Sequence, residues 1–201
     1  MRPLHLACLT LMAAPLAARA GALVVSVTDA TGKPLPDAVV LLEPAAGKAA
    51  VKPLPETEIS QSKRQFMPRV TVVTVGTRVA FPNFDTVRHH VYSFSAAKTF
   101  ELKLYAGVPA APIQFDKPGL VVLGCNIHDR MAAWVVVADT PWFARSGADG
   151  VARIDEAPAG AYRLSAWHPG LAAGGATPAR ALQLGAGEQS EALKLAVEAQ
   201  P

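Results

Sequence analysis

Short apolar stretches bounded by Gly, Pro, Asn or Asp follow one another along most of the chain, and they constrain its fold more than any other feature. Many are rich in β-branched residues or alternate apolar with polar side chains, whereas few segments repeat apolar residues at helical spacing. Short strands at such regular spacing are typical of β-sandwiches. The sequence therefore predicts an all-β fold with strands at Leu23–Thr28, Ala38–Leu42, Val70–Val75, Arg78–Phe81, His90–Phe94, Phe100–Tyr105, Leu120–Gly124, Ala133–Ala138, Val151–Ile154, Ala161–Trp167, Ala179–Leu184 and Glu191–Val197.

The composition is that of a folded chain with a few longer connections. Of the 201 residues, 51% are hydrophobic and 17% are charged, which is too apolar for a disordered protein. The stretch Ala45–Pro55 has the composition of a linker, and a second break falls at residues 139–142. The segment Gly170–Pro178 is rich in Ala and Gly, which predicts a long loop.

The N-terminus has the features of a secretory signal. Arg2 is followed by the apolar stretch Leu4–Leu16 and then by the small residues Ala18 and Ala20 on either side of Arg19. Cleavage after Ala20 would remove both arginines and lower the formal net charge from +3 to +1. This weakens the electrostatic case for nucleic-acid binding, and no later stretch is apolar over the length of a membrane span. We therefore expect a periplasmic protein with no nucleic-acid partner and no membrane span.

The most informative pattern in the sequence begins at a single cysteine. Cleavage would remove Cys8 and leave Cys125, and one thiol cannot form an internal disulfide in an oxidising compartment. Cys125 begins a Cys-x2-His-x2-Met pattern with His128 and Met131, in a short connection between two apolar strands. A thiolate, an imidazole and a thioether are ligands of a blue copper centre, which needs one more imidazole. Zinc is a weaker candidate because Met is a poor zinc ligand.

The second imidazole is expected from the adjacent residues His89 and His90. Neighbouring residues on a strand point to opposite faces of the sheet, so only one of the two can reach a site that also includes Cys125. The strand pattern alone does not choose between them.

The stretch from Glu58 to Ala138 resembles the cupredoxins of the plastocyanin, pseudoazurin and amicyanin group. The Asn-x-Asp turn and His-x-Val of that family correspond to Asn83, Asp85, His89 and Val91, and the Cys-x2-His-x2-Met spacing is that of amicyanin. The resemblance implies a Greek-key β-sandwich that binds one type 1 copper per chain and has no catalytic residues. It also implies the metal ligands His89, Cys125, His128 and Met131.

Two positions depart from the family pattern. His90 stands where family members often have an Asn that ties the two ligand loops together, so His90 could take that role or compete with His89 as the ligand. Asn126 follows Cys125, and its side chain could hydrogen-bond across to the first ligand loop.

The flanks resemble a different module. The pattern around Val27, Gly32 and Pro34 is similar to the opening of a carboxypeptidase-regulatory-like, prealbumin-like module, and the pattern from Asp149 to Leu164 is similar to its later part. We therefore predict a signal peptide over residues 1–20, with a cupredoxin domain over 49–140. The predicted cupredoxin domain is inserted in, or packed on, a small prealbumin-like β-sandwich built from residues 21–48 and 141–201.

The whole chain looks similar to exported cupredoxins labelled methylamine utilisation proteins. This implies an electron carrier rather than an enzyme, with a dehydrogenase as donor and a cytochrome as acceptor. Two other functions stay open: a copper chaperone or storage protein, which would use the same ligands, and a β-sandwich interaction module with a vestigial metal site.

Other residues have both a structural and a functional interpretation. Arg88 and Arg130 adjoin the expected ligands, either as solvated surface or as a positive rim that docks an acidic redox partner. We expect structural roles for the remainder: Phe94 and Trp134 in the core, Met67 in the core or on the surface, and His168 in a turn.

Overall fold

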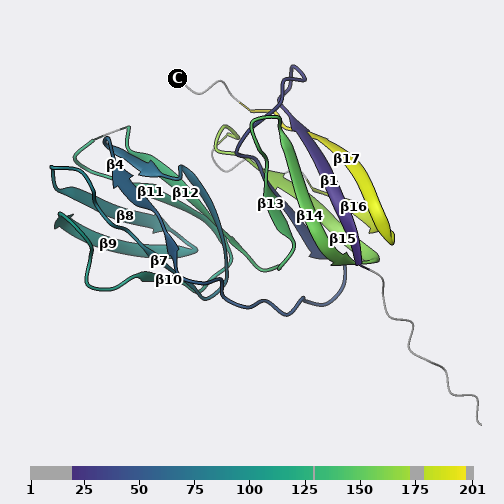
Figure 1. Ribbon diagram of the computed structural model, residues 1–201, viewed down its shortest axis with the longest axis horizontal. Helices are drawn as coiled ribbons and strands as arrows, with labels where there is room; N and C mark the ends of the chain where they lie inside the picture. Colours follow the sequence, from purple (N-terminus) through teal and green to yellow (C-terminus); the bar gives the residue numbers. More distant parts are fainter. Residues whose placement is uncertain (1–19, 129, 173–178, 198–201) are drawn as a thin grey trace, which may run out of the picture.

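The computed structural model describes residues 20–128, 130–172 and 179–197. These residues form strands and connecting loops, arranged as two β-sandwiches side by side (Figure 1). The predicted all-β fold is therefore confirmed. Among the described residues, none belongs to a helix long and apolar enough to cross a bilayer. The expected signal segment up to residue 19 and most of the expected loop at Gly170–Pro178 lie outside the described residues.

The first sandwich is built from both flanks of the chain. Its central strand β1 pairs in antiparallel fashion with β14 and in parallel fashion with β17, while β2 pairs with both β13 and β15. The apolar residues that alternate along β1, such as Leu23 and Val25, are fully buried between the two sheets. The sheets comprise β14 (Val151–Pro158), β1 (Ala20–Thr28) and β17 (Gly187–Lys194), and β13 (Phe143–Arg145), β2 (Val39–Pro44), β15 (Gly160–Trp167) and β16 (Ala179–Leu184).

The second sandwich contains the central part of the chain. A five-stranded sheet in the order β6-β12-β11-β8-β9 faces a three-stranded sheet and a separate hairpin, β4–β5. Large apolar side chains such as Phe81, Phe115 and Leu123 fill the space between them. The strands are β3 (Thr57–Glu58), β4 (Ser60–Ser62), β5 (Gln65–Met67), β6 (Val70–Thr74), β7 (Thr77–Ala80), β8 (His89–Ser95), β9 (Lys98–Tyr105), β10 (Ile113–Phe115), β11 (Gly119–Gly124) and β12 (Ala132–Ala138).

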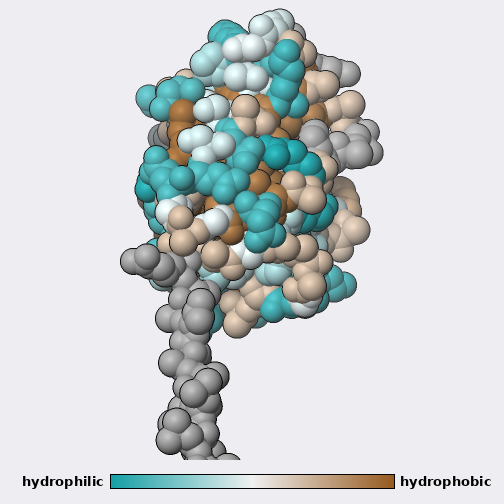
Figure 2. Space-filling view, turned by 90° about the vertical axis from the view of Figure 1, so that its right-hand side faces the viewer, coloured by the Kyte–Doolittle hydropathy of each residue, from teal (hydrophilic) through white to brown (hydrophobic). Residues whose placement is uncertain are grey.

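The two sandwiches contact each other through apolar side chains. Val39 of the first sandwich is buried against Val70 and Val136 of the second. The rings of Trp134 and Trp167 lie next to this cluster, with centroids 6.5 Å apart. The far side of the first sandwich, around β16 and β17, instead shows hydrophilic side chains (teal) spread between hydrophobic ones (brown) in Figure 2. The first sandwich therefore covers part of its apolar surface by packing it against the second sandwich.

Two residues expected in the core are placed differently. Phe94 is 80% exposed, which corrects the prediction that it lies in the core. The cause is the alternation of β8, which buries Val91 and Ser93 on one face and turns Tyr92 and Phe94 to the other. Trp134 is only partly buried, and it lies at the contact between the two sandwiches and not inside the core of either one.

Gly150 lies where the backbones of the two flanks of the chain approach each other closely, so a side chain there should destabilise the first sandwich. Its backbone has a φ of 75°, and a Cβ at this position would lie 2.6 Å from the carbonyl oxygen of Val27 and 3.0 Å from the amide nitrogen of Leu35. We expect Gly150→Ala to lower the free energy of unfolding by about 2–4 kcal/mol, from unfavourable φ together with overpacking against backbone. Urea denaturation measures this difference. Gly185→Ala is the matched control, since no atom lies within 4 Å of the added Cβ.

Candidate metal centre

Three of the predicted ligands meet at one end of the second sandwich. His89 begins β8, Cys125 follows β11, and His128 lies in the loop between β11 and β12. Each offers one ligand atom, and these atoms lie within 4.8 Å of one another. His89 Nδ1 is 3.8 Å from Cys125 Sγ, and the two imidazole rings have centroids 5.2 Å apart. The fold therefore brings together residues from two separate strands at one point.

The ligand atoms are enclosed, except on the side of His128. His89 is fully buried and Cys125 is 4% exposed, whereas His128 is partly exposed. Met131 is 2% exposed and belongs to the same apolar cluster as Cys125. A metal held here would be largely shielded from water, and of its three predicted nitrogen and sulfur ligands His128 is the most exposed.

The second ligand loop is short because antiparallel pairing brings its two ends together. Gly124 of β11 pairs with Ala132 of β12, and the Met131 N–H donates to the His128 carbonyl at 2.9 Å across the loop. Gly124 also lies under the ring of Tyr92, where a Cβ would be 2.7 Å from the Tyr92 Cζ atom. A glycine before Cys125 thus lets the two neighbouring strands approach each other at the site.

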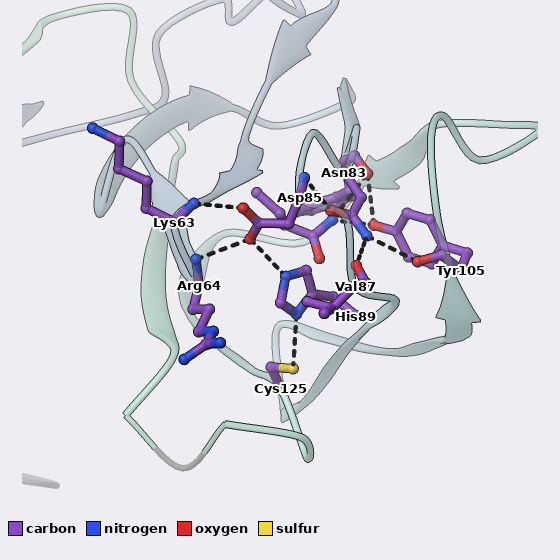
Figure 3. A network of polar contacts seen from close by, with 10 residues as sticks. Lys63, Arg64, Asn83, Asp85, Val87, His89, Tyr105 and Cys125 are labelled. Carbon is purple, nitrogen blue, oxygen red and sulfur yellow. Dashed lines mark hydrogen bonds and ion pairs between the residues drawn. The ribbon is translucent and has the colours of Figure 1, made fainter.

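The orientation of His89 is set by a carboxylate. His89 Nε2 lies 2.8 Å from an oxygen of Asp85, which assigns the proton to Nε2 and leaves Nδ1 free to face Cys125. Asp85 also accepts hydrogen bonds from the backbone N–H groups of Lys63 at 2.7 Å and Arg64 at 2.9 Å (Figure 3). Lys63 and Arg64 form the turn of the β4–β5 hairpin, with φ values of 53° and 60°. A hairpin distant in sequence therefore fixes the first ligand.

The electrostatic environment of Asp85 favours its ionised form. Burial by itself raises the pKa of Asp85, but hydrogen bonds from Arg64, His89 and Lys63 more than offset this effect. The pKa of Asp85 is therefore below its ordinary value. An anionic carboxylate against Nε2 in turn holds the His89 ring in a fixed orientation.

Asn83 shapes the loop that carries Asp85. Its Oδ1 accepts from the Asp85 N–H at 2.9 Å, and its Nδ2 donates to the carbonyls of Val87 and Tyr105, both at 2.9 Å. The Tyr105 hydroxyl donates to the Phe81 carbonyl at 2.6 Å, and burial raises the pKa of Tyr105 to about 12. Tyr105 is therefore neutral at physiological pH, and this network supports the loop without supplying a ligand (Figure 3).

The donor set fits copper. His128 Nδ1 is buried and has no hydrogen-bond partner among the described residues, as expected of an atom kept for a metal. A thiolate, two imidazoles and a thioether suit copper, whereas the thioether suits zinc poorly. The side chains at this site are therefore of the types that could hold copper.

The structure separates the two adjacent histidines. His90 lies on the other side of β8, with Nε2 2.9 Å from a carboxylate oxygen of Glu101 and its ring 5.4 Å from that of Tyr92. His89 and not His90 is therefore the residue next to Cys125.

Other sequence expectations had different outcomes. The side chain of Asn126 is exposed and forms no hydrogen bond to the first ligand loop within the described part of the chain. His168 accepts the Gly170 N–H at 3.0 Å, so it lies in a turn as expected, and Met67 is on the surface. The role of Asp85 was not foreseen. The spacing of Asp85 four residues before His89 was the only local signal for it.

Asp85→Asn tests the contribution of this carboxylate. We expect it to lower the free energy of unfolding of the metal-free protein by about 1–3 kcal/mol at neutral pH. An amide accepts fewer hydrogen bonds, and its NH2 group would face donors. Because the pKa of Asp85 is lowered in the folded state, its ionisation stabilises the fold above the unfolded value of about 3.9. This contribution is lost as the pH falls from there through the folded pKa.

Urea denaturation at neutral and at acidic pH measures this difference, which should narrow in acid. Asp155→Asn is the control, because Asp155 is exposed on the first sandwich and its main contact is an ion pair with Arg153. We expect a change within about 0.5 kcal/mol for the control. An Asp85→Asn protein as stable as the control at neutral pH would show that the hairpin does not depend on the carboxylate.

Comparisons with known proteins give structural likenesses only. No protein-family model and no curated protein matches the chain. A reduced Cu(I) form of an amicyanin variant is 18% identical, covering 43% of this chain and 92% of that chain, with a TM-score of 0.38. A purple cupredoxin from Nitrosopumilus maritimus is 20% identical, covering 41% of this chain and 98% of that chain, with a TM-score of 0.36. A copper-containing nitrite reductase from Thermus scotoductus SA-01 is 25% identical, covering 56% of this chain and 28% of that chain, with a TM-score of 0.39.

These scores carry no argument about function. The chain itself is an all-β protein with a cluster of His89, Cys125, His128 and Met131 that is consistent with a cupredoxin.

Proposed function

We propose that the chain is a periplasmic type 1 copper protein that carries single electrons. The observation that supports this most directly is the convergence of His89, Cys125 and His128, whose ligand atoms lie within 4.8 Å of one another. The bound copper would supply a one-electron couple between Cu(I) and Cu(II). The role of the chain is to hold that ion, shield it and connect it to the surface.

The protein holds the ligands rigidly. Cys125 and His89 are attached to paired strands, Asp85 orients His89, and the buried Met131 would supply a thioether to the copper. Ligands that rearrange little between oxidation states allow fast electron exchange. Enclosed ligands favour a carrier over a copper chaperone, because handover to a partner needs ligands that the partner can reach.

The partly exposed edge of His128 is the proposed electron port. Exposed apolar side chains lie on the two ligand loops: Ile127, next to His128 in the sequence, is 47% exposed, and Phe84 of the first ligand loop is 65% exposed. Val108 is 71% exposed and follows Gly107, which is bonded to Asn83 of the first ligand loop. An exposed apolar patch of this kind is typical of a surface that contacts another protein.

The partners are part of the proposal. We propose a dehydrogenase as donor and a cytochrome as acceptor, in amine or methylamine oxidation, on the basis of the sequence resemblance. The signal-like N-terminus supports export to the periplasm. If His89, Cys125, His128 and Met131 all held the copper, they would leave little room for a substrate as a ligand, which supports a carrier over an enzyme.

Electron self-exchange of the copper-loaded protein tests the carrier role. NMR line broadening in mixtures of the Cu(I) and Cu(II) forms should show fast exchange, while a chelator should remove copper only slowly. Rapid loss of copper to the chelator without reversible redox behaviour would instead identify a chaperone or storage protein. A folded, reduced protein that takes up no copper would identify an interaction module.

A further inference from the structure

The end of the second sandwich that carries the metal centre has cations without acidic partners. Lys63, Arg64, Arg88 and Arg130 are all exposed. None of these four side chains forms an ion pair with any residue that the structure describes. We call these four cations the basic rim. Asp129, which precedes Arg130, lies outside the described residues.

The first sandwich shows the opposite arrangement. Each of its arginines in a strand is paired with a carboxylate, which neutralises charge locally. The pairs are Arg145 with Asp37, Arg153 with Asp155 and Glu188, Arg163 with Glu43, and Arg180 with Glu191. The arginines of the first sandwich that lie in strands are therefore neutralised locally, whereas those beside the metal centre are not.

Three separate segments supply the basic rim. Lys63 and Arg64 form the hairpin turn that is bonded to Asp85, and Figure 3 shows their side chains extending away from that carboxylate. Arg88 directly precedes His89. Arg130 lines a hollow between the second ligand loop and β5, together with Met131.

Two carboxylates that the structure describes at this end, Asp85 and Glu101, have contacts of their own. The oxygens of Asp85 accept the Lys63 and Arg64 N–H groups and contact His89, so they face inward. Glu101 lies 2.9 Å from His90 Nε2. The exposed cations of the basic rim would give a positive field outside the site, and such a field steers opposite charges toward the surface at a rate that falls with ionic strength.

We propose that the basic rim docks an acidic protein surface, the redox partner of the proposed function on which this inference rests. Exposed Phe84 lies on the same loop as Arg88, and exposed Ile127 and the partly exposed His128 lie on the same loop as Arg130. An apolar centre inside a charged border is the anatomy of a protein–protein interface. Nucleic-acid binding would instead depend on cations alone, tracking the phosphates.

Binding of poly-L-glutamate to the metal-free protein tests the basic rim without depending on copper. At low salt the unmodified protein should bind this acidic polymer, and the double variant Arg88→Glu, Arg130→Glu should lose at least about tenfold in affinity. Lys63→Glu with Arg130→Glu provides a second variant that leaves the neighbour of His89 intact. Lys33→Glu with Lys194→Glu is the matched control, because both lysines are exposed on the first sandwich and the change in net charge is the same.

Oxidation of the copper-loaded protein by two small complexes gives the second measurement. Anionic hexacyanoferrate(III) should react more slowly as salt rises, and cationic tris(phenanthroline)cobalt(III) should react faster. The rim variants should reverse both trends, and the control should not.

An equal loss of affinity for poly-L-glutamate in the rim and control variants would overturn the proposal, because net charge alone would then explain binding. Tighter binding to a short DNA duplex than to poly-L-glutamate would also overturn it, in favour of a nucleic-acid surface. Intact polymer binding by a protein that takes up no copper would support the basic rim and contradict the proposed electron-transfer function instead.

Discussion

Cys125→Ser will abolish the intense visible band that we expect when Cu(II) is added to the purified protein. That band arises from charge transfer between a thiolate and copper, and a serine hydroxyl cannot supply it. Cys125 is 4% exposed and Sγ lies 3.8 Å from His89 Nδ1, so no other sulfur takes its place as the anionic ligand. Visible absorption during Cu(II) titration measures the loss, which we expect to be complete.

The fold should survive this substitution, because Ser and Cys have nearly the same size. Far-UV circular dichroism of the variant should match that of the unmodified protein, which separates loss of the ligand from loss of structure. A band that persists in Cys125→Ser would remove the thiolate from the site. A well-folded, reduced protein that shows no band at all would exclude a blue copper centre.

His89→Ala will lose the band and weaken Cu(II) binding by more than about a hundredfold, whereas His90→Ala will keep both. Removing a ligand should exceed the effect of removing its supporting partners, which is typically about 10–100-fold. His89 Nδ1 faces Cys125, while His90 faces Glu101 on the other side of β8. Titration of each variant with Cu(II), followed by visible absorption, measures the difference.

Added imidazole keeps this comparison decisive if His89→Ala is unstable. His89 is fully buried and contacts Asp85, so its removal leaves a cavity and an unpartnered carboxylate oxygen. Free imidazole should enter that cavity and restore the band, which a merely misfolded protein would not allow. Loss of the band in His90→Ala, with retention in His89→Ala, would reverse the ligand assignment.

Sequence periodicity placed most strands of four or more residues within a few positions, but it shifted the last one, predicted at Glu191–Val197, where β17 spans Gly187–Lys194. It missed the strands of two or three residues. The strand expected at Val70–Val75 is β6 at Val70–Thr74, and the one expected at Ala179–Leu184 is β16 with the same bounds. The hairpin strands β4 and β5 have three residues each, too few for an alternation to be recognised. Their omission mattered, because the turn between them supplies the hydrogen bonds that hold Asp85.

The exposure of Phe94 shows a second limit. Its size and apolar character suggested the core, but the face that a strand buries depends on which side another sheet packs. Tyr92 and Phe94 share a face of β8, and their rings are 5.2 Å apart. That face is opposite the one that buries Val91. Residue type alone therefore could not place Phe94.

By itself the sequence determined the all-β architecture and the cluster of Cys125, His128 and Met131, because both depend on neighbours within a few residues. Alternation along a strand and a short loop between paired strands are local properties. The choice of His89 over His90 depends instead on how β8 lies against β11, and the two strands are far apart in the sequence. The contact between the β4–β5 turn and Asp85 is also long-range. Only the tertiary structure decided these features, because pairing and packing between distant segments leave no periodic signal in either one.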